Sequence, residues 1–186
     1  MESDLVKRWR ALRGASRLAF GLTFRDMHVK PTVYIETSVI SYRTARPSRD
    51  LIVAAHQQMT HEWWERVLPQ CDAFVSPVVL EEIAHGDPDA AQRRQQSTAA
   101  FPVVEVLPEV HALAAAYFAA IPLPDKAQAD AYHLALAAWH GLDYLVSWNC
   151  THIVSGRVRM IVEEVNAEFG IRTPIICTPE ELMEVS

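Results

Sequence analysis

Cysteine is scarce in this chain, with three residues among 186, at Cys71, Cys150 and Cys177. They lie far apart and form no C-x-x-C pair, which excludes a disulfide framework and a zinc site built on paired cysteines. Such cysteine usage suits a reducing compartment. We therefore expect a cytoplasmic protein.

Long apolar runs are also lacking. No stretch approaches the roughly 20 apolar residues that span a bilayer. The apolar run near the start, Leu18–Phe24, is short, lies between Arg17 and Arg25, and has no A-x-A cleavage pattern. The sequence predicts neither a signal peptide nor a membrane partner.

Several catalytic motifs are missing. The chain has no G-x-S-x-G elbow, no G-x-x-x-x-G-K-[ST] loop, no G-x-G-x-x-G turn after a strand, and no H-E-x-x-H pair among its eight histidines. These absences argue against serine hydrolases, P-loop nucleotide hydrolases, dinucleotide enzymes and zinc metalloproteases.

Positive charge is scarce in most of the chain. Residues 1–30 hold seven Lys/Arg against three Asp/Glu, whereas residues 31–186 hold ten against twenty. So acidic a body argues against a broad basic face for nucleic acid, although it leaves room for a small phosphodiester site neutralised by metal. The basic extension of residues 1–30 is an extra helix, a loose arm, or sequence upstream of a start at Met27, and composition does not choose among these.

The remaining residues, 31–186, have the length and composition of one globular domain, and half of the whole chain is hydrophobic. Short β-favouring runs alternate with segments of helical periodicity from end to end. This alternation predicts an α/β domain whose parallel sheet is covered on both faces. The expected strands are 32–35, 73–75, 103–106, 144–147 and 174–177.

Acidic residues follow the expected strands. Glu36 stands where the first strand ends, and Glu82 lies on or beside the inward face of the helix after the second. Asp130 points along the buried stripe of a later helix, and Asn149 ends another strand. In a right-handed parallel sheet these ends emerge at one edge. Clustered carboxylates repel one another unless a cation joins them, and oxygen ligands suit Mg²⁺ or Mn²⁺. The chemistry that follows is hydrolysis of a phosphodiester by metal-activated water.

Three stretches at these positions resemble the PIN-domain family, in particular the VapC-like toxins of type II toxin–antitoxin systems. They are 34–38 (YIETS), 76–83 (SPVVLEEI) and 130–149, which ends in LVSWN. The resemblance implies a three-layer α/β/α sandwich with a central parallel sheet of about five strands. It also implies an endoribonuclease that uses Mg²⁺ or Mn²⁺, a cognate antitoxin, and a homodimer.

By the same resemblance Glu36, Glu82 and Asp130 are the metal ligands, and with Asn149 they form the catalytic set. Two positions depart from the family pattern, because the first is usually Asp and the last is often Asp. Asn149 brings no charge, and Glu36 moves its charge outward by one methylene. The alternative is therefore a PIN-like module that binds nucleic acid or protein but cleaves weakly or not at all.

Other polar residues have competing interpretations. Thr37 and Ser38, with Ser147 at the end of the fourth strand, are substrate-positioning candidates, although the first two serve equally well as caps of the next helix. His133 and His152 flank the site in sequence, but a lone histidine on a helix is usually structural, so a role as ligand or proton carrier ranks second.

The segment after the first strand is rich in arginine. Arg43, Arg46 and Arg49 surround Pro47 between the first strand and the next helix. We expect a solvated loop here, ahead of direct contact with substrate.

Overall fold

Four parallel strands form the central sheet in the computed structural model, in the order β2-β1-β3-β4. The model describes residues 30–122, 124 and 127–183. The predicted N-terminal extension therefore lies, except for Lys30, outside the described residues. The strands are β1 (Thr32–Ile35), β2 (Asp72–Phe74), β3 (Tyr144–Val146) and β4 (Ile175–Cys177).

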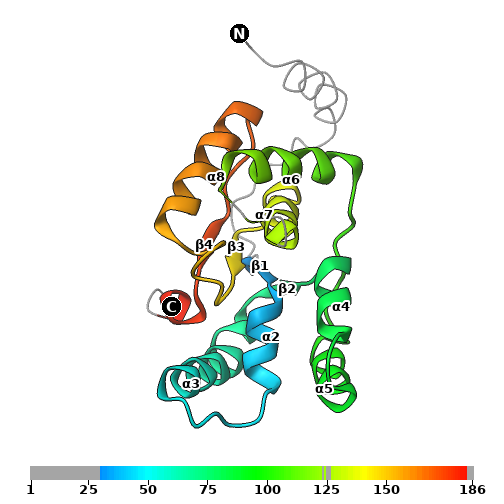
Figure 1. Ribbon diagram of the computed structural model, residues 1–186, viewed down its shortest axis with the longest axis vertical. Helices are drawn as coiled ribbons and strands as arrows, with labels where there is room; N and C mark the ends of the chain where they lie inside the picture. Colours follow the sequence, from blue (N-terminus) through cyan, green and yellow to red (C-terminus); the bar gives the residue numbers. More distant parts are fainter. Residues whose placement is uncertain (1–29, 123, 125–126, 184–186) are drawn as a thin grey trace.

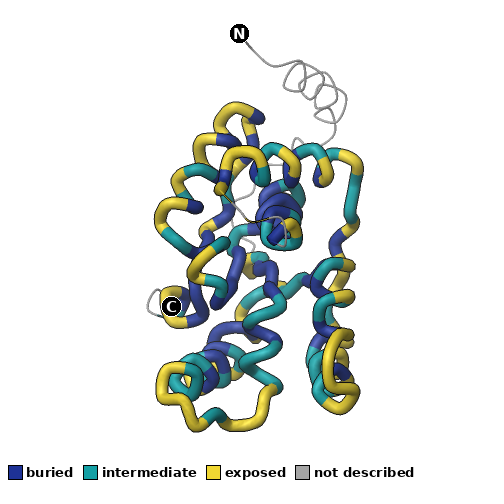
Figure 2. Tube along the Cα trace, in the orientation of Figure 1, coloured by how far each residue is buried: buried dark blue, intermediate teal, exposed yellow. Residues whose placement is uncertain are grey.

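The two central strands are the most deeply buried. Val33, Tyr34 and Ile35 of β1 and Leu145 and Val146 of β3 have no exposed surface. Both faces of these strands are covered, as expected for a parallel sheet between layers of helices. Figure 2 shows the same buried centre surrounded by more exposed helices and loops.

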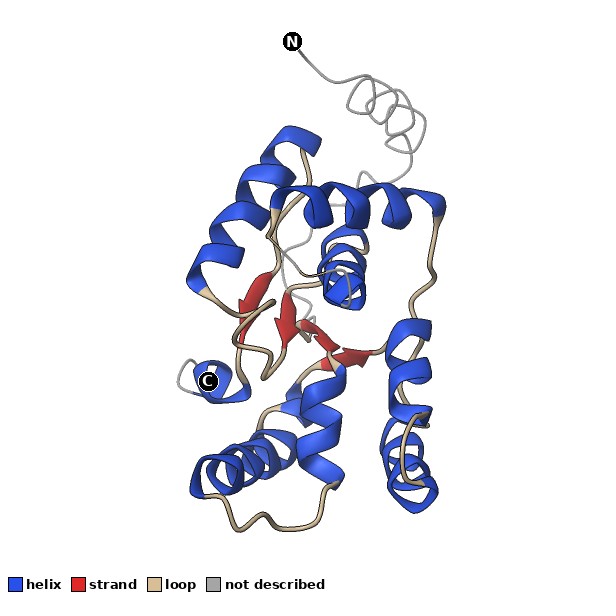
Figure 3. Cartoon of the chain, in the orientation of Figure 1, coloured by secondary structure: helices blue, strands red, loops and turns tan. Residues whose placement is uncertain are grey.

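Helices lie on both sides of this sheet (Figures 1 and 3). One group consists of α6, α7 and α8, which pack on one another, and the other contains α2, α3, α4, α5 and the short α9. The predicted α/β class with helices on both faces of a parallel sheet is confirmed. The bounds are α2 (Thr37–Thr44), α3 (Leu51–Arg66), α4 (Pro77–Ala84), α5 (Pro88–Thr98), α6 (Pro108–Ala120), α7 (Gln128–Trp139), α8 (Gly156–Phe169) and α9 (Pro179–Met183), with a 3-10 turn at η1 (Leu68–Gln70).

The strand predicted at 103–106 is reduced to a single bridge, so the described sheet has four strands rather than about five. Val103 pairs only with Val75, through hydrogen bonds from Val75 N to Pro102 O (3.1 Å) and from Val104 N to Val75 O (2.9 Å). Pro102 has no N–H to donate, and Pro108 starts α6 soon afterwards. The chain therefore leaves the sheet after one contact.

Helix α7 runs through the middle of the molecule. Its residues Ala131 and Leu134 to Ala138 are all buried, and the alanines among them allow close packing against α6. Among the described residues, no helix has both the length and the apolar character needed to cross a membrane. The central position of α7 carries His133 and Asp130 to the carboxyl edge of the sheet.

Candidate functional site: a carboxylate and histidine cluster

The site begins where β1 and β3 end side by side. The register pairs Ile35 with Val146, and Glu36 N donates to Val146 O at 3.1 Å, so Glu36 lies beside Ser147. Glu36 is the N-cap residue of α2, yet its side chain caps no N–H of that helix and is 95% buried, at 5% exposure. Its carboxylate is instead directed to the edge of the sheet.

Two serine hydroxyls hold the Glu36 carboxylate. Ser147 Oγ donates to Glu36 Oε2 at 2.7 Å, and Ser38 Oγ donates to the same oxygen. Backbone N–H groups fix both hydroxyls in turn, from Trp148 to Ser38 (2.8 Å) and from Asn149 to Ser147 (2.9 Å). The hydroxyl of Ser38 therefore serves a carboxylate rather than a helix cap.

Glu82 enters from α4. This helix starts with Ser76 as N-cap and Pro77 at its first position, as the sequence predicts. Glu82 Oε2 accepts hydrogen bonds from the Thr37 hydroxyl and from His133 Nε2, the latter at 3.0 Å. Because Thr37 follows Glu36 directly, it brings the two carboxylates to the same place.

His133 is fully buried and belongs to a polar chain. Its Nδ1 lies 2.8 Å from the Tyr34 hydroxyl, which lies 2.7 Å from Ser76 Oγ. Ser76 Oγ accepts from Val79 N at 3.3 Å. The chain ties Glu82 to β1 and to the start of α4. Asp130 and His133 are three residues apart on a helix, so they share one face. This spacing is the sequence signal that could have identified His133 as a site residue.

Charge and burial act against each other in the Glu82–His133 pair. Burial raises the pKa of Glu82, but the hydrogen bonds from His133 and Thr37 and the nearby histidine charges outweigh it and hold that pKa below its ordinary value. Burial lowers the pKa of His133, but the hydrogen bond to Glu82 and the charges of Glu36, Glu82 and Asp130 raise it overall. The ionised form of Glu82 and the protonated form of His133 therefore favour each other.

Asp130 forms a second unit beside this pair. Its Oδ1 accepts from Asn149 Nδ2 at 2.9 Å, and its Oδ2 lies 3.0 Å from His152 Nδ1. Asn149 Oδ1 also accepts from His152 N at 3.0 Å, so the three side chains are held as a group. Burial raises the pKa of Asp130, despite the opposing influence of His133 and His152. Both histidines that the sequence left in second rank thus contact predicted site carboxylates.

The donor atoms of Glu36, Glu82 and His133 all lie within 4.8 Å of one another. Both nitrogens of His133 already have hydrogen-bond partners, whereas Oε1 of each glutamate accepts no hydrogen bond from a described residue. The atoms available to an ion are therefore carboxylate oxygens, which fit Mg²⁺ or Mn²⁺ better than a softer metal. Among the described residues Asp130 is not in this group of three, since its own oxygens face Asn149 and His152.

The site thus offers two neighbouring carboxylates with available oxygens, a third carboxylate in an adjoining hydrogen-bonded unit, and hydroxyls that fix their orientation. An arrangement of this kind can hold a divalent cation at the carboxyl edge of a parallel sheet. Neither a protein-family model nor a curated protein matches this chain.

Proposed function

We propose that the protein is a metal-dependent endoribonuclease of the VapC-like, PIN-domain type. The observation that carries the proposal is the meeting of Glu36 and Glu82, from separate βα units, with donor oxygens close enough to share one ion. Two adjacent carboxylates form a negatively charged site that attracts a divalent cation, and a phosphodiester also carries negative charge that a cation can bridge. The resemblance of residues 34–38, 76–83 and 130–149 to that family supports the same conclusion.

In this proposal each side chain has a distinct task. Glu36 and Glu82 would hold the ion, while Ser38 and Ser147 keep Glu36 in place and His133 keeps Glu82 ionised and oriented. A bound Mg²⁺ or Mn²⁺ would supply positive charge and activate water for attack on an RNA phosphodiester.

The third acidic unit completes the proposed site. Asp130, fixed by Asn149 and His152, lies within electrostatic reach of Glu82 and His133. There it would orient water or the substrate phosphate, or join the ion when substrate is bound.

The experiment compares purified wild-type protein with Glu82→Gln and Glu81→Gln variants. Each protein is incubated with labelled RNA and Mn²⁺ or Mg²⁺, and cleavage products are followed by gel. Glu81 is exposed on the same helix, so its variant removes the same charge outside the site. We expect Glu82→Gln to lower the cleavage rate by at least about 100-fold and Glu81→Gln to leave it within about twofold. Equal rates in all three proteins would refute the site.

One observation favours a different class, a PIN-like binding module without cleavage. Both oxygens of Asp130 are engaged by Asn149 and His152, and burial favours its neutral form. In such a module the carboxylates stabilise the carboxyl edge of the sheet and bind a partner. RNA binding by the wild-type protein without any metal-dependent cleavage would support this alternative.

The resemblance leads us to propose two protein partners as well. One is a cognate antitoxin that blocks the acidic site, and the other is a second copy of the chain in a homodimer. Co-expression with the product of a neighbouring gene, followed by size-exclusion chromatography with light scattering, tests both. A monomer that co-purifies with nothing and is not inhibited would contradict both partners.

A further inference from the structure

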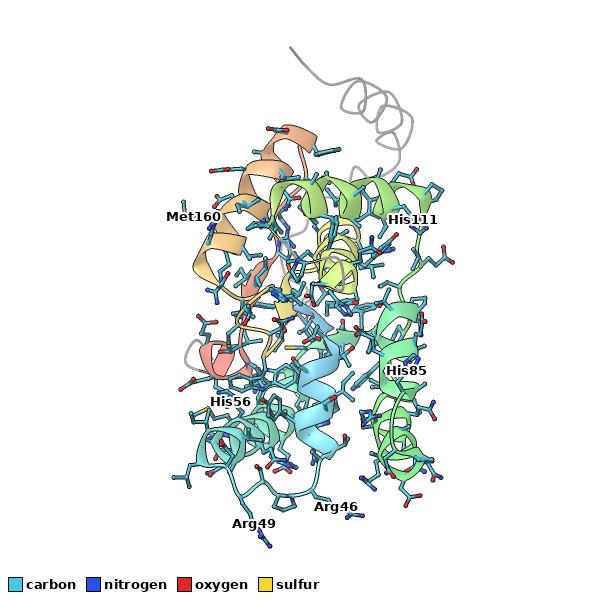
Figure 4. All side chains as sticks on the ribbon, viewed as in Figure 1. Arg46, Arg49, His56, His85, His111 and Met160 are labelled. Atoms are coloured by element: carbon cyan, nitrogen blue, oxygen red, sulfur yellow. The ribbon has the colours of Figure 1, made fainter. Side chains whose placement is uncertain are left out.

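Arginines gather at one end of an otherwise acidic body. Residues 31–186 contain ten Lys/Arg, and five of them lie on α2, on the loop after it, or on α5. Figure 4 shows two of these, Arg46 and Arg49, extending from the loop between α2 and α3. Residues 31–186, which hold twice as many acidic as basic residues, thus have half of their Lys/Arg in one region.

A surface pocket of about 410 Å³ lies between α2 and α5 in this region. Its lining includes Ser41, Thr44, Arg46, Asp87, Arg93 and Arg94. Asp87 is the acidic residue among them, and its Oδ1 already accepts from Ala90 N at 2.9 Å as the N-cap of α5. Three guanidinium groups against one engaged carboxylate leave the pocket positively charged.

Two of the three arginines are held by backbone carbonyls. Arg93 Nε donates to Thr44 O at 3.3 Å, at the end of α2, and Arg94 donates to Ile83 O (3.0 Å) and His85 O (2.5 Å), at the end of α4. Because a guanidinium has five N–H donors, each keeps donors for a ligand. The backbone carbonyl of Arg46 accepts from Gln57 Nε2 at 2.9 Å, but its guanidinium makes no hydrogen bond or ion pair with a described residue. The pocket therefore combines two positioned cations with one that can adjust to a ligand.

A stripe of hydroxyls connects the pocket with the carboxylate site. Thr37, Ser41 and Thr44 are spaced by four and three residues, so they share one face of α2, and that helix packs on α4 and α5. Thr37 donates to Glu82 at one end, and Ser41 and Thr44 line the pocket at the other. At 1.5 Å per residue the stripe runs about 12 Å from Glu36 to Thr44.

We propose that this arginine pocket binds the phosphate backbone of single-stranded RNA, at a site distinct from the carboxylate cluster. Guanidinium groups match phosphate oxygens bidentately, and a pocket without a defined base-reading surface binds backbone irrespective of sequence. The inference rests on the proposed nuclease function, since an RNA strand in the pocket would be led along α2 toward Glu36 and Glu82. It explains how so acidic a protein retains an RNA chain.

The test measures binding apart from cleavage. A short fluorescein-labelled single-stranded RNA of mixed sequence is titrated with Glu82→Gln protein in EDTA, by fluorescence anisotropy at several salt concentrations. The first comparison is Arg46→Gln against Arg49→Gln, both in the Glu82→Gln background. Arg49 leaves the same loop but does not line the pocket, so it is the matched control.

We expect Arg46→Gln to weaken RNA binding about threefold to tenfold and to make the slope of log K against log salt shallower by about 0.7, the value for one lost phosphate contact on a single strand. Arg49→Gln should keep the wild-type slope. Equal losses of RNA affinity in the two variants, or an unchanged salt slope in Arg46→Gln, would refute the proposal that this pocket binds RNA.

A second pair of variants, at Ser41 on α2, tests the pocket without changing the loop that carries Arg46 and Arg49. Ser41→Asp places a negative charge on the pocket wall, whereas Ser41→Asn adds a side chain of similar size without charge. Weaker RNA binding in Ser41→Asp alone supports the proposal, and identical affinities refute it. Polyglutamate that competes as strongly as unlabelled RNA of equal charge would also refute it, in favour of an acidic protein segment.

The pocket and the nuclease function can fail separately. If RNA affinity depends on Arg46 but the wild-type protein never cleaves RNA, the pocket proposal is supported and the proposed nuclease function is refuted. If the protein cleaves RNA but its RNA affinity does not depend on Arg46, the nuclease function is supported and the pocket proposal is refuted.

Discussion

His133 is the residue on which the buried part of the site depends. It has no exposed surface, and both ring nitrogens are hydrogen-bonded, to Glu82 Oε2 at 3.0 Å and to the Tyr34 hydroxyl at 2.8 Å. A buried imidazole without partners would be costly, so the surrounding residues must offer a carboxylate on one side and a hydroxyl on the other. Tyr34 and Ser76 provide the second side, which explains why a strand at the centre of the core carries a tyrosine.

Asp130 gives a pH-dependent prediction at the same scale. Its folded-state pKa is raised, so the folded protein holds the proton more tightly than the unfolded chain does. Stability from this group is then greatest below the ordinary carboxyl pKa of about 3.9 and falls as pH rises through the folded pKa. At pH 7 the ionised Asp130 is destabilising in the absence of divalent metal. Asp130→Asn should therefore raise the free energy of unfolding at pH 7 by up to about 1 kcal/mol.

Urea unfolding in EDTA at several pH values measures this difference. The gain of Asp130→Asn over wild type should shrink as pH falls through the raised folded-state pKa of Asp130, and its pH-dependent part should be gone below about 4, where this position is neutral in both proteins. Asp72→Asn is the control, since it removes one charge at an exposed position of β2. A gain that is equal in both variants, or that grows in acid, would contradict the raised pKa.

Residue types at strand ends were readable from the sequence, but their partners were not. Glu36 and Glu82 were found because each follows a strand, and strand ends of a parallel sheet converge. His133 and His152 were ranked low because a histidine on a helix face carries no sign of what faces it. The contacts of His133 come from Tyr34 and Glu82, which are distant in sequence, and only the fold brings them together.

At the scale of elements, α2 organises the site. It begins immediately after β1, so Thr37 and Ser38 in its first turn stand beside the end of the strand. Their hydroxyls bind Glu82 and Glu36 rather than the N–H groups of the helix. The helix start is thus left without a side-chain cap, a loss of stability that is typical of functional sites.

Two other helix starts give a matched pair of variants. Ser76 caps α4 and Ser155 caps α8, each accepting from a backbone N–H at 3.3 Å, of Val79 and Val158 respectively. Replacement of an N-cap serine by alanine costs about 1 kcal/mol. Ser76→Ala also removes a partner of the buried Tyr34 hydroxyl, so we expect about 2–3 kcal/mol for it and about 1 kcal/mol for Ser155→Ala.

Chemical unfolding measures both variants, and proton NMR of the histidines reports the environment of His133. We expect the His133 signals to change in Ser76→Ala and to stay in Ser155→Ala. Equal stability losses with unchanged His133 signals would mean that the chain from Ser76 to His133 contributes nothing beyond the cap.

The alternation of strands and helices could be predicted because periodicity and caps are local signals. Local signals do not show that the strand expected at 103–106 fails to form, because its residues favour a strand by composition. Whether they pair depends on the neighbouring strand, and Val75 offers Val103 a single bridge. Pairing is a property of two segments, so a sequence window that contains one of them predicts it poorly.

At the scale of the whole molecule, charge is separated into two regions. The carboxylates gather at the carboxyl edge of the sheet, and arginines gather around the far end of α2 and the middle of α5. An RNA strand would be repelled by most of the surface and attracted at one end. A metal ion would reverse the sign at the other end, which makes binding of the ion and binding of RNA mutually supportive.

This separation predicts that divalent metal stabilises the whole fold. Only the folded state brings Glu36 and Glu82 together, and an ion that binds only that state raises the free energy of unfolding by about 2.7 kcal/mol at 100 times its dissociation constant. For a domain of this size the increase corresponds to a rise in melting temperature of roughly 5–10 °C. Differential scanning calorimetry in EDTA and in Mn²⁺ or Mg²⁺ measures this rise in melting temperature directly.

In Glu36→Gln combined with Glu82→Gln the rise should vanish, whereas Glu81→Gln should keep it. A rise of the same size in the double variant would show that the ion binds elsewhere, and no rise in the wild type would remove the metal from the proposed function.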